Sequence, residues 1–335
     1  MKRAHAGFTI IELMISIVLG LLLVAAASQL FWGGVVSARL QQAAGDMQDN
    51  GMFGLDYIAK DVRLANYGNV LNLSLSDITP WGGIVLTTTN LPQTTPLSSG
   101  LMTHSGGETV GTGNEWTGVS NVSQAGAAQA SDQLTIQYQA PANMSNCEGQ
   151  AVLAGDLVVE RYFLREDGVS ADSQIKNLAL ACDANTPAAT TGAVSAQPAA
   201  ITGFGGAGQI IMSRVDQFHI VLGAQDLAGN MSYYTVAQYN TAAAAARAGA
   251  AAVVGPPAVP ARAATVAPRI VSIQISALVR SLDNTNSALI DPTRSFTLFD
   301  QTVTPNTATA PNTNRFVRQV YTTTIALRNA LGVNV

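Results

Sequence analysis

The chain has 335 residues, a formal net charge of −4 and 11% charged residues. Its length allows one large or two small domains, and its 47% hydrophobic content comes partly from one apolar segment and partly from alanine. The acidic balance argues against direct nucleic-acid binding, because phosphate contacts require clustered Lys and Arg. We expect no cofactor.

The N-terminus combines a short basic leader, Met1–Gly7, with a long apolar segment. From Leu13 to Val36 there is no ionisable side chain, a length that matches a hydrocarbon core of roughly 30 Å. Lys2 and Arg3 precede this segment, and the first charge after it is Arg39. The positive-inside rule therefore predicts a cytoplasmic leader and an external remainder.

A cleaved secretory signal has a similar outline, but its small-residue site follows the apolar region, whereas Gly7 precedes it here. We therefore expect the apolar helix to stay in the mature protein. Gly7-Phe8, Glu12 and the run Ile10–Leu23 resemble the type III signal of type IV prepilins. The resemblance implies that a prepilin peptidase cleaves after Gly7 and that the new amine of Phe8 is methylated.

Glu12 places a carboxylate in the apolar segment, which costs a few kcal/mol near the bilayer interior. Cleavage would create a positive amine at Phe8, four residues earlier and on the same helical face. The resemblance to pilins implies an assembly salt bridge, in which Glu12 meets the Phe8 amine of a neighbouring subunit as the helices stack. The alternative is that Glu12 lies near enough to the membrane surface to stay solvated.

The helix is predicted to continue beyond the membrane, because apolar positions from Leu40 to Ala65 keep a spacing of three and four. Gly51, after Asn50, and Gly54 argue for a break. The hydrophobic phase recovers beyond them without a shift, so we predict a continuous helix, bent there at most. It should end near Asn66, after roughly 88 Å at 1.5 Å per residue.

The remainder of the chain is predicted to form a β-rich head, because residues 132–139 and 270–279 alternate apolar and polar side chains. Further strands are expected at 83–88, 156–164, 214–222, 231–236 and 316–327. Residues 166–168 and 226–230 look like hairpin turns. Helix first and strands after predict an α+β, pilin-like fold in which the long helix packs on a mostly antiparallel sheet with long loops.

Three segments lack strand alternation: 87–131 and the low-complexity insertions 183–208 and 241–268. We expect surface loops, although the alanine run of the last segment could form a short helix because Ala has the highest helix propensity. The predicted organisation is a leader (1–7), a membrane-spanning helix (8–36), an amphipathic periplasmic half of that helix (37–68) and a globular head (69–335).

Cys147 and Cys182 lie on the side assigned as periplasmic, where a disulfide can form. The bond would close a loop of 36 residues, worth roughly 4 kcal/mol in the chain-entropy model. Two free thiols, or half of a metal site, are the alternatives. The pair lacks the CxxC spacing that zinc sites usually show, so we predict the disulfide.

Catalytic and metal-binding patterns are weak. His104 lies in a Ser/Gly loop and His219 in a predicted strand, neither with a recognisable nucleophile motif, so we expect no enzymatic activity. Asp167 and Asp172 could contribute oxygen ligands to a calcium ion, but the EF-hand pattern is absent. A solvated turn is the expected role of these two aspartates, and we expect no metal.

Further segments resemble PilW-type minor pilins within the type IV family: Gln48–Leu55, Ile58–Gly68, Ile275–Ser281 and Arg318–Asn329. Position 29 is Gln, where major pilins commonly carry a Pro that kinks the helix. Together with the length of the chain, this departure argues against a major pilin.

The resemblance implies a minor pilin of a priming complex at or near the pilus tip, which promotes filament assembly and so supports twitching motility, attachment and DNA uptake. The implied partners are other minor pilins, the major pilin, the prepilin peptidase and the inner-membrane assembly platform. The implied location is the inner membrane, single-pass with a periplasmic C-terminus, before assembly into the extracellular pilus. A J-type minor pseudopilin of type II secretion and a tip adhesin are the alternatives.

Overall fold

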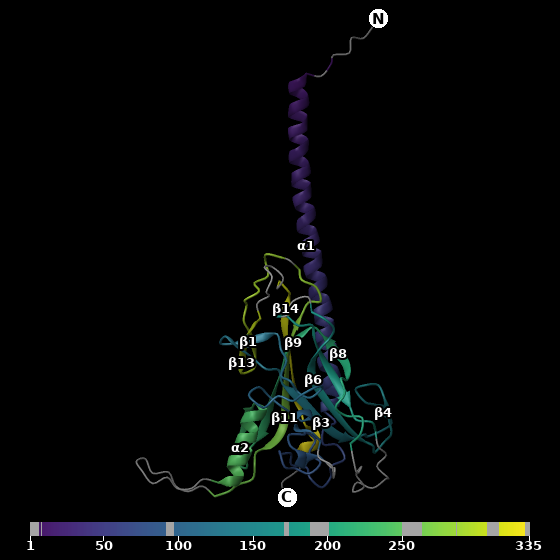
Figure 1. The fold of residues 1–335 in the computed structure, drawn as a ribbon, viewed down its shortest axis with the longest axis vertical. Coiled ribbons are helices and arrows are strands. Elements are labelled where there is room, and N and C mark those ends of the chain that lie inside the picture. Colours follow the sequence, from purple (N-terminus) through teal and green to yellow (C-terminus); the bar gives the residue numbers. More distant parts are fainter. Residues whose placement is uncertain are drawn as a thin grey trace, which may run out of the picture.

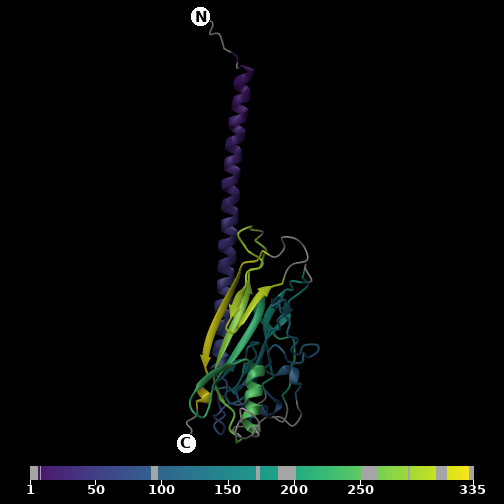
Figure 2. The same cartoon turned by 90° about the vertical axis from the view of Figure 1, so that its left-hand side faces the viewer.

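The computed structural model describes residues 7, 9–91, 97–170, 174–187, 201–249, 263–285, 287–306 and 315–331. Helix α1, Ile10–Val62, leaves one end of a β-rich head as a single rod (Figures 1 and 2). Its 53 residues span about 80 Å at 1.5 Å per residue. Its first buried residue is Met47, so the head covers only the C-terminal turns. The predicted α+β architecture is confirmed.

Helix α1 ends at Val62, four residues before the predicted end. The chain then turns, and Asn66 takes a left-handed conformation with φ of 67°, which an α-helix of L-residues does not continue. The Asn66 side chain accepts a hydrogen bond from the Gly83 N–H (3.1 Å) and donates to the Asn329 carbonyl (2.9 Å). The end of the helix is therefore set by contacts with distant segments, not by its own periodicity.

Gly51 and Gly54 do not break α1, because each allows the head to approach the helix closely. A Cβ atom on Gly51 would lie 2.5 Å from the ring of Tyr321, and one on Gly54 would lie 2.5 Å from Met212. Asn50 adds a side-chain bond to each backbone group of Ser213, donating to its carbonyl (2.7 Å) and accepting from its N–H (3.2 Å). The lower part of α1 thus packs between two strand edges.

We predict that Gly51→Val lowers the melting temperature of the head, because the added atoms overlap the Tyr321 ring and overpacking typically costs about 1–3 kcal/mol. Melting of the detergent-solubilised protein, followed by near-UV circular dichroism, measures the change. Gly45→Val is the matched control, since it makes the same change in the same helix where no atom lies within 4 Å of the added Cβ. Equal melting of the two variants would contradict the close-packing role.

Two four-stranded sheets form most of the head (Figures 1 and 2). Their strand orders are β3 (Gln133–Gln139), β6 (Leu157–Glu166), β7 (Leu178–Ala184), β8 (Gln209–Ser213), and β10 (Met231–Tyr234), β9 (Val215–Gln225), β11 (Arg269–Arg280), β14 (Arg318–Ala326). Smaller sheets contain β12 (Phe296–Leu298), β13 (Gln301–Pro305), β1 (Val122–Gln124), β2 (Ala127–Ala128), and β4 (Met144–Ser145) with β5 (Ala151–Val152). The strand pairs of the described residues are antiparallel.

One hydrophobic core joins both large sheets to the lower part of α1. Ile58 and Val62 of the helix are fully buried in it, together with Ile136 of β3 and Ile273 of β11. Burying a side chain of this kind contributes roughly 1.5–3 kcal/mol. The apolar face that the sequence predicts between Leu40 and Ala65 is therefore buried against the head only from Met47 onward.

Most predicted strands are confirmed, as β3, β6, β9, β10, β11 and β14. Residues 83–88 form only an isolated bridge, Ile84 to Ile136, before a short 3₁₀ helix, Thr88–Asn90. The Asn90 side chain accepts from the N–H groups of Leu86 and Thr87, which turns the chain away from the sheet. Two other 3₁₀ helices span Ser99–Leu101 and Arg328–Ala330.

The turn predicted at 226–230 joins β9 to β10, with the Asp226 N–H donating to the Asn230 carbonyl (3.0 Å). The hairpin predicted at 166–168 joins the antiparallel strands β6 and β7, but its connection is longer than predicted and extends over 167–177, because Glu166 pairs with Leu178. Strand β7 was not predicted. Both of its faces are buried, so the sequence LALACDA shows no apolar–polar alternation.

The loop predicted at 241–268 needs correction, because its alanine run belongs to helix α2, Val236–Ala248. Thr235 and Gln238 form a capping box at its start, which also ends β10 two residues before the predicted limit. Residues 250–262 lie outside the described ones, as do 188–200 of the other insertion. Residues 183 and 184, at the beginning of the insertion predicted at 183–208, form the end of β7.

Candidate assembly surface

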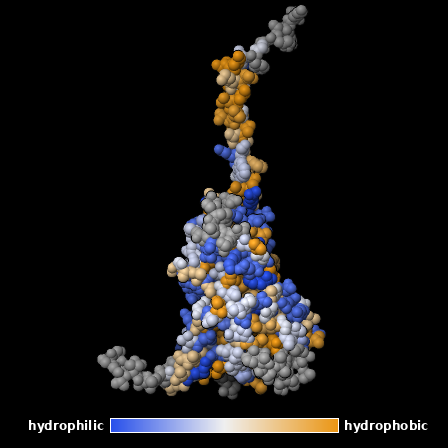
Figure 3. Space-filling view, in the orientation of Figure 1, coloured by the Kyte–Doolittle hydropathy of each residue, from blue (hydrophilic) through white to orange (hydrophobic). Residues whose placement is uncertain are grey.

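The N-terminal part of α1 presents an apolar surface that the head does not cover. Residues 9–34 are all exposed, with Ile10 and Leu30 each 80% accessible. Figure 3 shows a hydrophobic column along the upper part of the rod, followed by paler and hydrophilic side chains before the rod reaches the mixed surface of the head. Within the described residues, α1 is the one helix long and apolar enough to cross a membrane by length and composition. Such a surface requires lipid or neighbouring apolar helices.

Glu12 lies in the first turn of α1, with its side chain exposed. Thr9 is the N-cap residue, and its hydroxyl oxygen accepts from the Glu12 N–H at 3.3 Å. A carboxylate in the first helical turn is stabilised by the helix dipole. The Thr9 hydroxyl also lies 3.5 Å from Glu12 Oε2. The proposed partner, Phe8, lies outside the described residues, whereas Gly7 is described and exposed.

The Thr9 contact was missed in the sequence, although the signal was available there. Thr-x-x-Glu before an apolar run is the pattern of a capping box, and Thr9-Ile10-Ile11-Glu12 matches it. One of the two reciprocal capping bonds is present. Glu12 therefore takes part in the cap at the start of the helix. A test of its role in assembly has to separate an effect on assembly from an effect on capping.

The junction between α1 and the head contains two buried carboxyl groups, Asp61 of α1 and Glu160 of β6. The Tyr162 hydroxyl lies 3.0 Å from Asp61 Oδ2 and 3.2 Å from Glu160 Oε2. A phenol has one proton to donate, so one of these two contacts has to use a proton carried by a carboxyl group. Glu160 also accepts from Tyr138 (3.3 Å) and from the Cys147 N–H (2.8 Å).

The pKa values of both carboxyl groups are raised at this junction. Burial, followed by repulsion from Asp61, raises the pKa of Glu160 from 4.5 to about 8. Burial raises the pKa of Asp61 from 3.8 to about 6, against the lowering effect of its bond to Tyr162. Both shifts agree with the hydrogen count, because each favours a neutral carboxyl group between the helix and the sheet.

The raised pKa values predict that the head is less stable at high pH. Between pH 4.5 and about 8 the folded state retains the Glu160 proton that the unfolded state releases, so stability falls as pH rises through that window. This direction is opposite to that of an ordinary salt-bridged carboxylate. Glu160→Gln should flatten the decline, because the amide is neutral at both ends, and the melting temperature at about pH 5 and about pH 8 measures it.

Glu166→Gln is the matched control for that measurement, because its side chain is 54% exposed and pairs with Lys176 at the surface. It should leave the pH dependence unchanged. The pKa of His219 is also raised in the folded state, to about 9, so its contribution to stability is likewise lost as pH rises. Some pH dependence of the melting temperature should therefore persist in Glu160→Gln. A slope identical to that of the unaltered protein would contradict the role assigned to Glu160.

The disulfide predicted between Cys147 and Cys182 is present, with the two Cα atoms 6.1 Å apart. It ties the segment between β4 and β5 to strand β7. The same segment contacts α1, since the Tyr57 hydroxyl donates to the Cys147 carbonyl at 3.1 Å. Because the Cys147 N–H also donates to Glu160, the disulfide, the buried carboxyl groups and the helix form one connected junction.

The two histidines of the head have structural contacts. His219 places Nδ1 2.7 Å from Asp132 and Nε2 2.8 Å from Asp300, and only an imidazolium can donate to both. Burial lowers the pKa of His219, but the two carboxylates outweigh it and raise the pKa to about 9. His104 stacks on Trp116, with ring centroids 5.0 Å apart.

Of the two aspartates considered for calcium, Asp172 lies outside the described residues. The Asp167 N–H donates to the Asn177 carbonyl, which places Asp167 in the connection between β6 and β7.

Two family models match parts of this chain. A family model described as Type IV Pilus-assembly protein W matches residues 166–329, and the prokaryotic N-terminal methylation motif matches residues 2–28. The chain is also similar to a type IV-like pilin from Thermus thermophilus, with 14% identity, 62% of this chain and 83% of that chain covered, and a TM-score of 0.26. The comparison with curated proteins gave no match.

The methylation motif and the apolar helix that follows it define a prepilin-type protein and suggest membrane anchoring. Within this class, the match to the W-type assembly family points to a pilus-assembly protein. The matched region begins at the end of β6 and continues past β14. By these two matches the chain resembles a PilW-like type IV pilin.

Proposed function

We propose that this protein is a minor pilin of the type IV pilus, and that it primes filament assembly as part of a complex at or near the pilus tip. The observation that carries the proposal is the apolar column of α1, exposed from residue 9 to residue 34 and joined to a large head. Neighbouring subunits can cover that column when their helices stack. Other minor pilins, the major pilin and the inner-membrane assembly platform are the partners proposed, in filaments that serve motility, attachment and DNA uptake.

Two features favour a minor over a major subunit. Helix α1 continues without interruption through Gln29, where major pilins commonly carry Pro. The head is also large, with loops such as 97–121 that add bulk around its sheets. A bulky head suits a subunit present in few copies, because a regular filament repeats the same head-to-head packing at every position. Pilins are structural subunits, and we propose no catalytic step.

We further propose that the prepilin peptidase removes residues 1–7 and that Phe8 is then methylated. Residues 8–36 would anchor the chain in the inner membrane, residues 37–68 would lead into the head, and the head (69–335) would lie in the periplasm before assembly. The positive charges of Lys2 and Arg3 support this orientation. Mass spectrometry should find a methylated N-terminal peptide that begins at Phe8, and an N-terminus at Met1 in cells without the peptidase would be the matching control.

Gene deletion followed by complementation tests the filament role. We expect loss of surface pili and of twitching, both restored by the unaltered gene, with exoprotein secretion unaffected. Normal piliation together with lost secretion would instead identify a J-type pseudopilin of type II secretion. Normal piliation and secretion with lost attachment would favour a dedicated tip adhesin over a priming subunit.

A further inference from the structure

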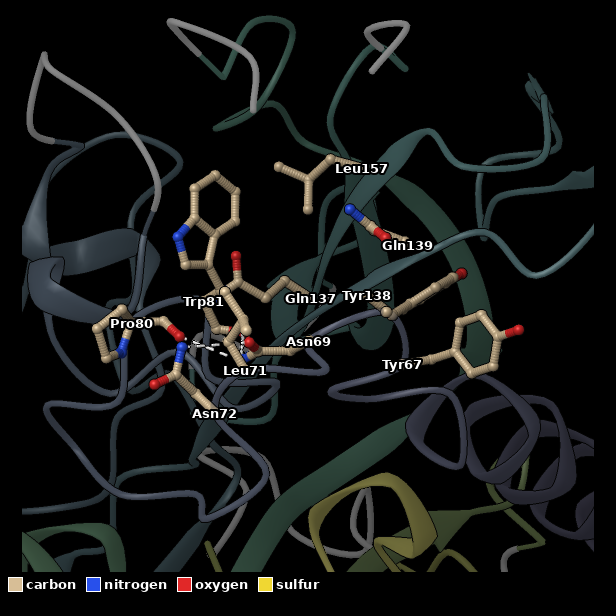
Figure 4. Close-up of a pocket in the computed structure, with 11 residues that line it drawn as sticks. Tyr67, Asn69, Leu71, Asn72, Pro80, Trp81, Gln137, Tyr138, Gln139 and Leu157 are labelled. Atoms are coloured by element: carbon tan, nitrogen blue, oxygen red, sulfur yellow. Dashed lines mark hydrogen bonds between the residues drawn. The ribbon is translucent and has the colours of Figure 1, made fainter. Parts of the chain in front are cut away.

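The chain that follows the C-terminal end of α1 lies at the end of the head farthest from the exposed part of the helix (Figure 1). It lines a pocket of about 190 Å³. The pocket forms between the segment that follows α1, residues 67–81, and the end of strand β3. Figure 4 shows the Trp81 indole and the Gln139 amide on opposite sides of the pocket, with Leu157 between them in this view. The volume is well above the ~10–15 Å³ that one water molecule needs.

The lining combines aromatic surface with amide groups and contains no Asp, Glu, Lys, Arg or His among the described residues. Tyr67 and Trp81 supply rings, and Asn72 and Gln139 supply amides that can both donate and accept hydrogen bonds. Within the described part of the chain, the Gln139 side chain makes no hydrogen bond of its own. A charged ligand would find no counter-charge in this pocket, so the chemistry favours a neutral one.

Gln137, which also lines the pocket, is held in a fixed position by its neighbours. Its side chain is 1% exposed, and its Nε2 donates to the carbonyls of Gly82 (2.7 Å) and Asn90. Because a carbonyl can only accept, the amide orientation is settled and Oε1 is left without a partner among the described residues. This oxygen is itself buried, so Gln137 forms part of the wall of the pocket and is not assigned as a contact for its occupant.

The backbone of Trp81 has a strained conformation. Its φ of 64° is in the left-handed region, which is a clear outlier for a bulky side chain. The Asn69 side chain stabilises this conformation by donating to the carbonyls of Pro80 and Trp81, each at 3.1 Å. Asn69 Nδ2 also lies 3.1 Å from Asn66 Oδ1, four residues beyond the end of α1. The Trp81 side chain also packs, partly buried, against the cluster that contains Leu157. Backbone strain of this kind is a ground for a functional hypothesis.

We propose that this pocket binds a neutral carbohydrate, with one sugar ring lying against Trp81 and its hydroxyl groups bonded to the amides of Gln139 and Asn72. A sugar ring has a C–H face that packs on an aromatic ring and O–H groups that pair with amides, so it matches both parts of the lining. The position at the far end of the head leaves the pocket open to the surroundings of an isolated subunit. The proposal does not rest on the role in filament priming.

Calorimetric titration of the full chain tests the proposal, in a detergent without a sugar headgroup so that the detergent does not compete. The probes are neutral oligosaccharides of glucose, galactose, mannose and N-acetylglucosamine, with sialylated and sulfated oligosaccharides as charged counterparts. We expect at least one neutral probe to bind and the charged counterparts to bind more weakly. Absence of binding by every neutral probe at millimolar concentration, or preference for the charged ones, would overturn the proposal.

Four variants locate the binding. Trp81→Ala and Gln139→Ala should each weaken binding by about tenfold or more, as expected for central contacts of a small site. Leu71→Ala, beside the pocket and 83% exposed, should weaken it less. Leu289→Ala is the matched control, an equally exposed leucine (82%) that does not line the pocket. Gln139→Ala keeps the test valid if Trp81→Ala misfolds, and unchanged affinity in Gln139→Ala would show that the sugar binds elsewhere.

Discussion

Glu12→Ala is expected to abolish or strongly reduce surface piliation while the head keeps its melting temperature. The carboxylate is exposed in the first turn of α1, far from the buried part of the helix that begins at Met47. In the stacked filament, the proposed partner of Glu12 is the Phe8 amine of a neighbouring subunit. Loss of that pair would leave an amine without a counter-charge in an apolar helix bundle, where an unpaired charge costs several kcal/mol.

Two further variants separate assembly from helix capping at Thr9. Glu12→Gln removes the charge but keeps a residue suited to the third position of a capping box, so it should fail like Glu12→Ala. Thr9→Ala removes the N-cap oxygen that accepts from the Glu12 N–H, at a typical cost of about 1 kcal/mol, and should retain most pili. Electron microscopy of surface pili measures all three. Normal piliation in Glu12→Gln would show that capping, not charge, explains the glutamate.

Removal of the Cys147–Cys182 disulfide is expected to have the largest effect on the stability of the head. The double variant Cys147→Ala, Cys182→Ala should lose about 2–5 kcal/mol, because the bond closes a long loop in the unfolded chain. The loss should extend to the helix junction, since Cys147 also contacts Tyr57 of α1 and Glu160 of β6. Thermal unfolding of the detergent-solubilised protein, followed by near-UV circular dichroism, measures the effect.

The unaltered protein under reducing conditions is the control for that variant, because it keeps the volume of both sulfur atoms while breaking the bond. It should melt close to the double variant. If reduction leaves the melting temperature unchanged and the double variant is destabilised, the packing of the sulfur atoms, not the covalent bond, is responsible. If both melt like the oxidised protein, the disulfide contributes nothing measurable.

The sequence predicted the elements whose signals are local. A long apolar run defines α1, and alternation of period two defines strands such as β3 and β11, because one face of each meets the core. Strand β7 escaped prediction because burial on both faces removes the alternation. Helix α2 was left as one of two alternatives, since alanine propensity alone does not show whether a segment packs against a core.

The functional residues also fall into two groups, those with a local sequence signal and those that only the tertiary packing explains. Gly7, Phe8 and Glu12 lie close together in the chain, so a processing and assembly motif can be predicted from the sequence alone. Glycines 51 and 54 were ambiguous in the sequence, because a glycine in a helix signals a break or a close approach equally well. Only the packing of Tyr321 and Met212 against them decides for close approach.

By itself, the sequence determined a prepilin leader, an apolar helix with one carboxylate, a strand-rich head and the disulfide pairing, since each depends on neighbouring residues or on a single pair of cysteines. The tertiary structure alone decided where α1 ends, how Asp61 and Glu160 come to share one phenol, and which residues surround the Trp81 pocket. Those features depend on residues far apart in the chain, which are brought together by burial of the common core.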